Sequence, residues 1–139
     1  MLYQTHARVH LNNIRSNIEN IRKAVGAERK ILIAVKADAY GHGAVDVSRM
    51  AEKIGVDWLG VATVPEGIEL RLAGIGLPIL KFSPAFAEEM EEAVKHDLAI
   101  AVIERENIAM LQKAAATAGK VCEVHLKIET GMGRIGVSV

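Results

Sequence analysis

Hydrophobic and polar residues alternate along the chain with two different periods. Between residues 12 and 25 the apolar side chains recur every three or four positions and Gly26 follows them, so we expect a helix there. The continuous aliphatic run at 31–35, which Lys36 ends, is too short for a helix and is typical of a strand covered on both faces. A short strand-like piece at 8–11 precedes both.

The same succession of short apolar runs and amphipathic stretches continues to residue 128. Thr63, Pro65 and Glu66 form a capping-box pattern that begins a helix. Further strands are expected at 58–62, 78–82, 98–103 and 121–128, and further helices at 44–54, at 63–74, from Ser83 onward and at 104–118. Short strands that alternate with longer helices indicate parallel β-α units, because parallel neighbours need crossover connections. The predicted fold class is therefore α/β.

Five such strands make up more than half of an eight-stranded (β/α) barrel of the TIM type. The alternative is an open doubly wound sheet that binds a dinucleotide, but the first β-α turn lacks the G-x-G-x-x-G pattern. We therefore expect residues 1–139 to form the amino-terminal part of an incomplete barrel. Its two open edges give the chain the look of a truncated domain.

Composition and charge limit the functions that the chain can have. The 139 residues are 50% hydrophobic, which is enough for one compact core. Seventeen basic and seventeen acidic side chains cancel, which argues against binding to nucleic acid or to an anionic membrane surface. No run approaches the ~18 apolar residues of a membrane span. The single cysteine, Cys122, suits a reducing, cytoplasmic compartment.

The first candidate for chemistry is Lys36, which ends the strand at 31–36. Alternation places it on the same face as Leu32 and Ala34, and this face points inward in a barrel. A lysine at the carboxyl end of a barrel strand lies where catalytic loops gather, and partial burial favours the neutral amine that forms a Schiff base. On position alone, an ordinary surface lysine is the alternative.

The residues after Lys36 suggest a ligand-binding loop. Residues 37–43 set small side chains around Tyr40 and His42, just before a helix amino terminus that suits a phosphate. The alternative is an ordinary turn in which Asp38 caps backbone groups and Tyr40 covers the edge of the core.

A second polar cluster lies in and after the last strand. Four ionisable residues share one face of it: Glu123, His125, Lys127 and Glu129. If the apolar face meets the helices, these groups face the barrel interior and need ion pairs or hydrogen bonds. An edge strand with a solvated polar face is the alternative. The glycine-rich residues 130–136 present Arg134, whose planar fork suits a carboxylate or phenolate oxygen, although an exposed ion pair would also explain it.

Two segments closely resemble the signature segments of bacterial alanine racemases. They are Ala-Val-Lys-Ala-Asp-Ala-Tyr-Gly-His-Gly at 34–43 and His-Leu-Lys-Ile-Glu-Thr-Gly-Met-Gly-Arg-Ile-Gly at 125–136. The resemblance extends to residues 60–67 and 69–74. It implies the eight-stranded α/β barrel of the fold-type III pyridoxal-phosphate enzymes, with the remaining barrel strands and a carboxyl-terminal β-domain absent from these 139 residues.

The resemblance also implies roles for individual residues. Lys36 is the lysine that forms the internal Schiff base with pyridoxal 5'-phosphate and then acts as an acid/base group at the α-carbon. Tyr40 bonds the cofactor phosphate, and Arg134 contacts the phenolic oxygen and the substrate carboxylate. Lys127 matches a lysine that is carbamylated in some members and braces this arginine. Glu129 replaces the family's usual aspartate and is longer by one methylene group.

The implied activity is that of an isomerase, which interconverts L-alanine and D-alanine through a pyridoxal-phosphate aldimine and two-base proton transfer, and supplies D-alanine for peptidoglycan. The full-length enzyme is implied to be a homodimer, with the second base on a tyrosine of the absent carboxyl-terminal domain. We therefore expect the 139 residues alone to be inactive. Three alternatives stay open: another pyridoxal-phosphate-dependent racemase or decarboxylase, a truncated non-catalytic fragment, and a cofactor-free Schiff-base aldolase.

Overall fold

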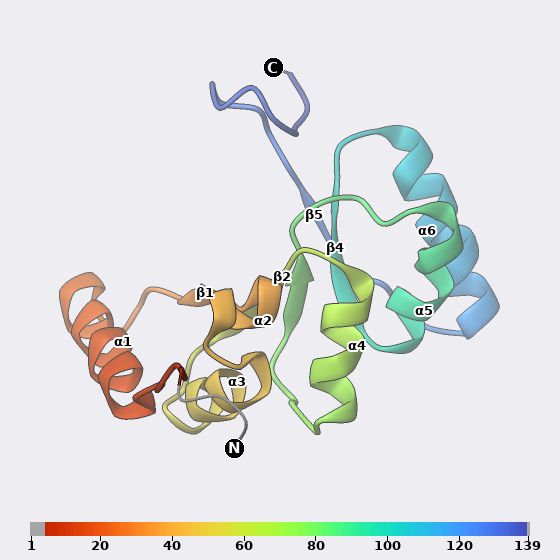
Figure 1. Cartoon of the computed structure of the whole chain (residues 1–139). Helices are drawn as coiled ribbons and strands as arrows, with labels where there is room; N and C mark the ends of the chain where they lie inside the picture. The colour runs from red at the N-terminus through yellow and green to blue at the C-terminus, as the bar shows by residue number, and fades with distance from the viewer. Residues whose placement is uncertain (1–4, 139) are drawn as a thin grey trace.

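The computed structural model describes residues 5–138, which form one parallel sheet with helices between its strands (Figure 1). Residues 1–4 and Val139, which the predicted domain includes, lie outside this part. The strands are β1 (Leu32–Ala34), β2 (Trp58–Val61), β3 (Ile79–Lys81), β4 (Leu98–Val102) and β5 (Val124–Leu126). The helical elements are α1 (Leu11–Val25), α2 (Lys36–Gly41), α3 (Ala44–Lys53), α4 (Val64–Leu72), η1 (Ala87–Glu89), α5 (Met90–Lys95) and α6 (Arg105–Ala118).

The order of strands in the sheet is the order in the chain, β1-β2-β3-β4-β5, and every neighbouring pair is parallel. Successive helices also lie side by side, since α1 contacts α3, α3 contacts α4, α4 contacts α5 and α5 contacts α6 (Figure 1). These features confirm the predicted α/β class and the incomplete barrel. No helix within residues 5–138 has both the length and the apolar character needed to cross a membrane.

The core lies between the sheet and its helices. Five strand residues that face the helices in the middle of the sheet are at most 1% exposed: Leu59, Val61, Ile79, Ile100 and Val102. The two edge strands are less covered, with Leu32 of β1 38% exposed and Leu126 of β5 61% exposed. Burial therefore falls from the middle of the sheet toward both open edges.

The sheet curls toward the face opposite the helices. Trp58 on β2 and His125 on β5 meet with ring centroids 5.2 Å apart, although three strand spacings of about 4.8 Å would separate these strands in a flat sheet. Lys127, just after β5, likewise donates to the carbonyl oxygen of Phe82, just after β3, over 3.3 Å. This concave face corresponds to the interior of a barrel.

The edge strands and the amino-terminal segment differ from the predicted elements. β1 and β5 are shorter than 31–36 and 121–128, because each edge strand has one neighbour and forms a ladder only where it pairs with it. The strand predicted at 8–11 is wrong. The backbone of His10 is extended, with φ −105° and ψ 91°, but residues 8–10 join no strand in the described part of the chain, and α1 begins at Leu11.

The helix predicted from Ser83 onward begins later than expected, at η1 and α5. Lys81 is only 3% exposed, and its ammonium group donates to the carbonyl oxygens of Ser83 and Pro84 over 3.2 and 2.7 Å. It also donates to the Ser83 hydroxyl over 3.0 Å. Because these carbonyl groups already serve a buried cation, the chain stays irregular until the Glu89 carboxylate caps the Phe86 N–H.

The packing of α4 on the sheet depends on a glycine. A Cβ atom at Gly67 would lie 2.7 Å from Cδ1 and 2.9 Å from Cδ2 of Leu98, which is 2% exposed at the start of β4. The missing side chain therefore lets α4 approach the sheet closely.

We expect Gly67→Ala to lower the free energy of unfolding by about 1 kcal/mol, because overlap with Leu98 outweighs the gain in helix propensity. In a Leu98→Ala background, the same change should raise it by up to about 1 kcal/mol, because the cavity accepts the added methyl group. Urea unfolding of the four variants measures both effects. Changes of the same sign in both backgrounds would contradict the packing argument.

Candidate functional site

The predicted site residues follow the two edge strands of the sheet. Lys36 and Tyr40 come after β1, and Lys127 and Arg134 come after β5. Because all strands are parallel, both pairs lie at the same, carboxyl end of the sheet (Figure 1). They lie on opposite edges, however, and within residues 5–138 no hydrogen bond or ion pair joins one pair to the other.

The chain after β1 forms a left-handed helical turn rather than the loop that we expected. Residues 37–40 have φ between 49° and 54° and ψ between 42° and 52°, and none of them is glycine. Each such residue costs roughly 1–2 kcal/mol in this conformation. Lys36 therefore opens a strained turn instead of ending β1, and the surrounding contacts must hold this turn in place.

The strand residues before Lys36 alternate between a buried and an open face, as predicted. Ile31 and Val35 are 9% and 1% exposed, whereas Leu32 and Ala34 between them are open on the concave side. Lys36 itself is half-buried, with its Nζ 5.8 Å from the centroid of the Tyr40 ring, a distance typical of a cation–π contact. The turn thus brings the predicted lysine and tyrosine together.

Asp38 fixes the end of the turn. Its Oδ1 accepts a hydrogen bond from the backbone N–H of Ala44 over 2.7 Å, at the start of α3. This is the capping role that the alternative interpretation gave to Asp38. The Asp38 carboxylate therefore occupies the N–H of Ala44, one of the donors at the start of α3 that we expected a phosphate to use.

Glu66 fixes the start of the turn through a contact that no local sequence pattern indicates. Its Oε1 accepts from the backbone N–H of Ala37 over 2.8 Å, and its Oε2 accepts from those of Ala62 and Thr63 over 2.7 and 3.0 Å. The predicted capping box of Thr63 and Glu66 is confirmed. Partial burial alone would raise the pKa of Glu66, but these backbone donors outweigh it and hold the pKa below its usual value.

The polar face of β5 lies on the concave side, although the apolar residues Val124 and Leu126 on its other face are 44% and 61% exposed. His125 packs against Trp58, and its Nε2 lies 3.9 Å from Oε1 of Glu123. Lys127 and His125 line a hollow of about 250 Å³. The other residues around it are Leu80, Phe82, Ala101 and Leu126. Glu123 and His125 thus lie close to each other, whereas Lys127 and Glu129 have other partners, so the four ionisable residues do not form a single network.

The glycine-rich segment after β5 wraps around a carboxylate. Glu129 accepts from the backbone N–H groups of Gly131 and Arg134 over 2.7 and 3.1 Å. Hydrogen bonds from the backbone of Gly133 and Gly131 hold the pKa of Glu129 below its usual value. The Arg134 side chain is exposed, so the segment fixes its backbone and leaves its guanidinium group open.

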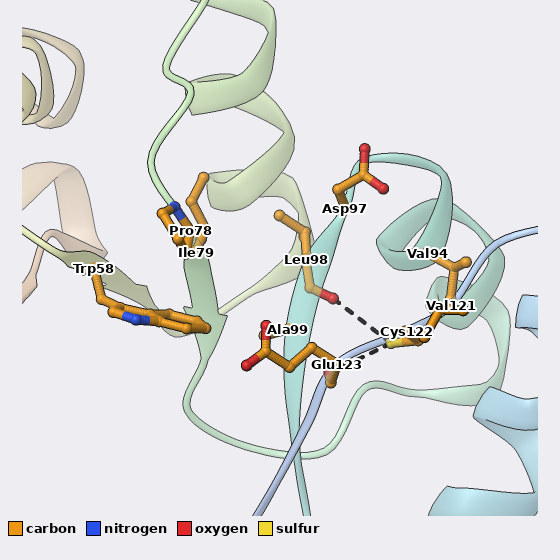
Figure 2. Close-up of a pocket in the computed structure, with 10 residues that line it drawn as sticks. All are labelled: Trp58, Pro78, Ile79, Val94, Asp97, Leu98, Ala99, Val121, Cys122 and Glu123. Atoms are coloured by element: carbon orange, nitrogen blue, oxygen red, sulfur yellow. Dashed lines mark hydrogen bonds between the residues drawn. The ribbon is translucent and has the colours of Figure 1, made fainter.

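A second cavity, of about 150 Å³, lies at the amino end of the strands (Figure 2). Trp58 and Glu123 face each other across the cavity (Figure 2). Cys122 lies on the side away from Trp58, with its Sγ 3.7 Å from the Leu98 carbonyl oxygen. Burial raises the pKa of the Cys122 thiol. The residues that line this cavity include no predicted site residue, so it is separate from the carboxyl-end site.

Comparisons with known proteins agree on one family. Residues 9–139 match the family model "Alanine racemase, N-terminal domain". The chain is 48% identical over 134 residues to alanine racemase of Cutibacterium acnes and 47% identical over 134 residues to that of Treponema denticola. In each case the match covers 96% of the chain, and it covers 36% and 35% of the relatives.

A solved structure of alanine racemase from Clostridium difficile 630 in complex with cycloserine superposes with a TM-score of 0.95 and 40% identity. The match covers 99% of this chain and 38% of that one. The chain therefore spans about a third of the length of the relatives that it matches.

The Glu66 contacts predict how stability depends on pH. Because the folded state lowers the pKa of Glu66 below 4.5, its carboxylate stabilises the fold at pH 7, and this contribution disappears as the pH falls below about 4.5. We expect Glu66→Gln to lower the free energy of unfolding by about 2 kcal/mol at pH 7. The difference from wild type should shrink toward pH 3 in urea titrations. A difference that stays constant with pH would contradict this assignment.

Proposed function

Because the chain belongs to the family of alanine racemase N-terminal domains, we propose that it forms the cofactor-binding part of an enzyme that interconverts L-alanine and D-alanine. The observation that carries this proposal is the position of Lys36. It is a half-buried primary amine at the carboxyl end of a barrel strand. Within residues 5–138 it has no ion-pair partner, so its nitrogen is available for chemistry.

Alanine racemases as a family depend on pyridoxal 5'-phosphate, and the residues at this site fit that cofactor. Lys36 supplies an amine for its aldehyde, and Tyr40, 60% exposed, supplies a hydroxyl for its phosphate. Arg134 supplies an exposed guanidinium group for its phenolic oxygen. When bound, the cofactor spreads the negative charge that develops when an attached amino acid loses its α-proton.

We assign the following work to the chain's own residues. Lys36 would hold the cofactor through Nζ, and its amine would give a proton to the substrate α-carbon, or take one from it, on one face. Tyr40 donates a hydrogen bond to the phosphate. Arg134 pairs with the phenolic oxygen and orients the substrate carboxylate.

Lys127 is assigned to brace Arg134 as a carbamate. Carbamylation replaces a cation with an anion that can pair with a guanidinium group, and it leaves one N–H on Nζ for the Phe82 carbonyl oxygen that Lys127 already contacts. A high-resolution electron-density map that shows a bare amine at Lys127 would rule this assignment out.

Racemisation needs a proton-transferring group on each face of the substrate. Lys36 serves one face, and we propose that the other is served by a segment outside residues 1–139 in a homodimer. The relatives, which are about three times as long as this chain, have the length to supply such a segment.

We expect Lys36→Ala in the full-length protein to abolish the visible absorbance of lysine-bound cofactor and to reduce alanine racemisation at least about 10³-fold, because a nucleophile and an acid/base group are lost together. Lys53→Ala, which removes an exposed lysine at the end of α3, is the matched control and should leave both unchanged. Borohydride reduction of wild type, followed by peptide mass spectrometry, should place the cofactor on Lys36. A persistent absorbance band in Lys36→Ala would refute the assignment.

A further inference from the structure

Lys36 lies between two hydrogen bonds that tie its neighbours to other elements. The N–H of Val35 donates to the carbonyl oxygen of Gly60 in β2 over 2.8 Å. The N–H of Ala37 donates to Oε1 of Glu66 in α4, also over 2.8 Å. The backbone on both sides of Lys36 is therefore held by the next β-α unit, and Glu66 supplies the bond on the turn side.

The bond from Ala37 lies where the backbone changes hand. Val35 has φ −116°, whereas Ala37 has φ 49° and is the first of the left-handed residues. The direction of the Lys36 side chain depends on this change. The N–H of Ala39 donates to the carbonyl oxygen of Val35 over 2.8 Å and closes the turn locally. Glu66 is 29 residues away in the chain, so its bond adds a restraint from another element to this local one.

We propose that Glu66 is a positioning residue for Lys36, which fixes the direction of the cofactor-binding amine by holding the first left-handed residue after it. This inference rests on the proposed function. It assigns Glu66 no contact with the cofactor or the substrate.

The charge and shape of Glu66 both serve this role. A carboxylate offers an acceptor oxygen on each side, one for Ala37 and one shared by Ala62 and Thr63. A glutamine has only one acceptor oxygen. The two N–H donors of Ala62 and Thr63 attract this oxygen more strongly than the single donor of Ala37 does. Glu66→Gln therefore keeps the cap of α4 and turns its NH₂ group toward the Ala37 N–H, so that two donors face each other. The substitution breaks the bond beside Lys36 selectively.

Glu89 provides a matched control. It too is a glutamate that caps a helical element from its third position, where Oε2 accepts from the backbone N–H of Phe86 over 3.2 Å. It has no hydrogen bond to α2. Glu89→Gln thus weakens a similar cap and leaves the Lys36 turn intact.

The test compares wild type, Glu66→Gln and Glu89→Gln in the full-length protein by two readouts other than activity. Hydrogen exchange of the peptide that contains residues 36–43, measured without cofactor, should be at least tenfold faster in Glu66→Gln alone. The dissociation constant for pyridoxal 5'-phosphate should rise at least tenfold, and the circular dichroism of its bound absorption band should fall by more than half, again only in Glu66→Gln. Melting temperatures of both variants separate these effects from a general loss of stability.

Wild-type exchange and cofactor binding in folded Glu66→Gln would overturn the positioning role, as would equal changes in Glu89→Gln. That failure differs from a failure of the proposed function, in which wild type itself would not bind the cofactor through Lys36. If Glu66→Gln does not fold, the same readouts apply to Glu66→Asp, which keeps the charge and shortens the reach to Ala37. Its expected results are the same, and unchanged exchange would again overturn the proposal.

Discussion

Parallel pairing between neighbouring strands governs where everything else in this chain lies. Two parallel strands cannot be joined by a tight turn, so the chain must return over the sheet through a helix before each new strand begins. Every strand therefore leaves the sheet at the same, carboxyl end, and the segments that follow β1 and β5 are both found there. The sheet also curls, so that one of its faces is concave, and Trp58 meets His125 on this face.

Positively charged side chains have different kinds of partner at the two ends of the sheet. At the amino end, Arg71 donates to the carbonyl oxygens of four residues: Ile75, Leu77, His96 and Asp97. Lys120 there pairs with the Asp97 carboxylate at 2.9 Å. These cations are satisfied by the protein and hold its connections together. At the carboxyl end, Lys36 and Arg134 have no such carboxylate partner among the described residues, in agreement with the anionic cofactor that we propose for this end.

Local patterns predicted most of the fold because they act over a few residues. Helical spacing predicted α1, α3 and α6 to within a residue or two, and alternation placed His125 on the concave face. The capping box at Thr63 and Glu66 was likewise visible in the sequence. Each of these features follows from neighbouring residues alone.

The remaining features depend on contacts that the sequence does not reveal. Nothing in residues 37–40 requires a left-handed turn, because no glycine stands there, and the turn is stabilised by Glu66 from another element. The delayed start of α5 has a similar cause, since buried Lys81 takes the carbonyl groups that would have begun the helix. In both places a distant or buried charge overrides the local preference of the chain.

The strands follow one another in the sheet in the same order as in the chain, and this order affects how such a domain folds. Each β-α unit pairs with the unit made just before it, so no strand must wait for a partner that emerges much later. Contacts that close short loops form quickly and cost little chain entropy. A nascent polypeptide can thus lengthen this sheet one unit at a time during synthesis. At every stage the strand formed last, from β1 to β4, is the edge that receives the next strand.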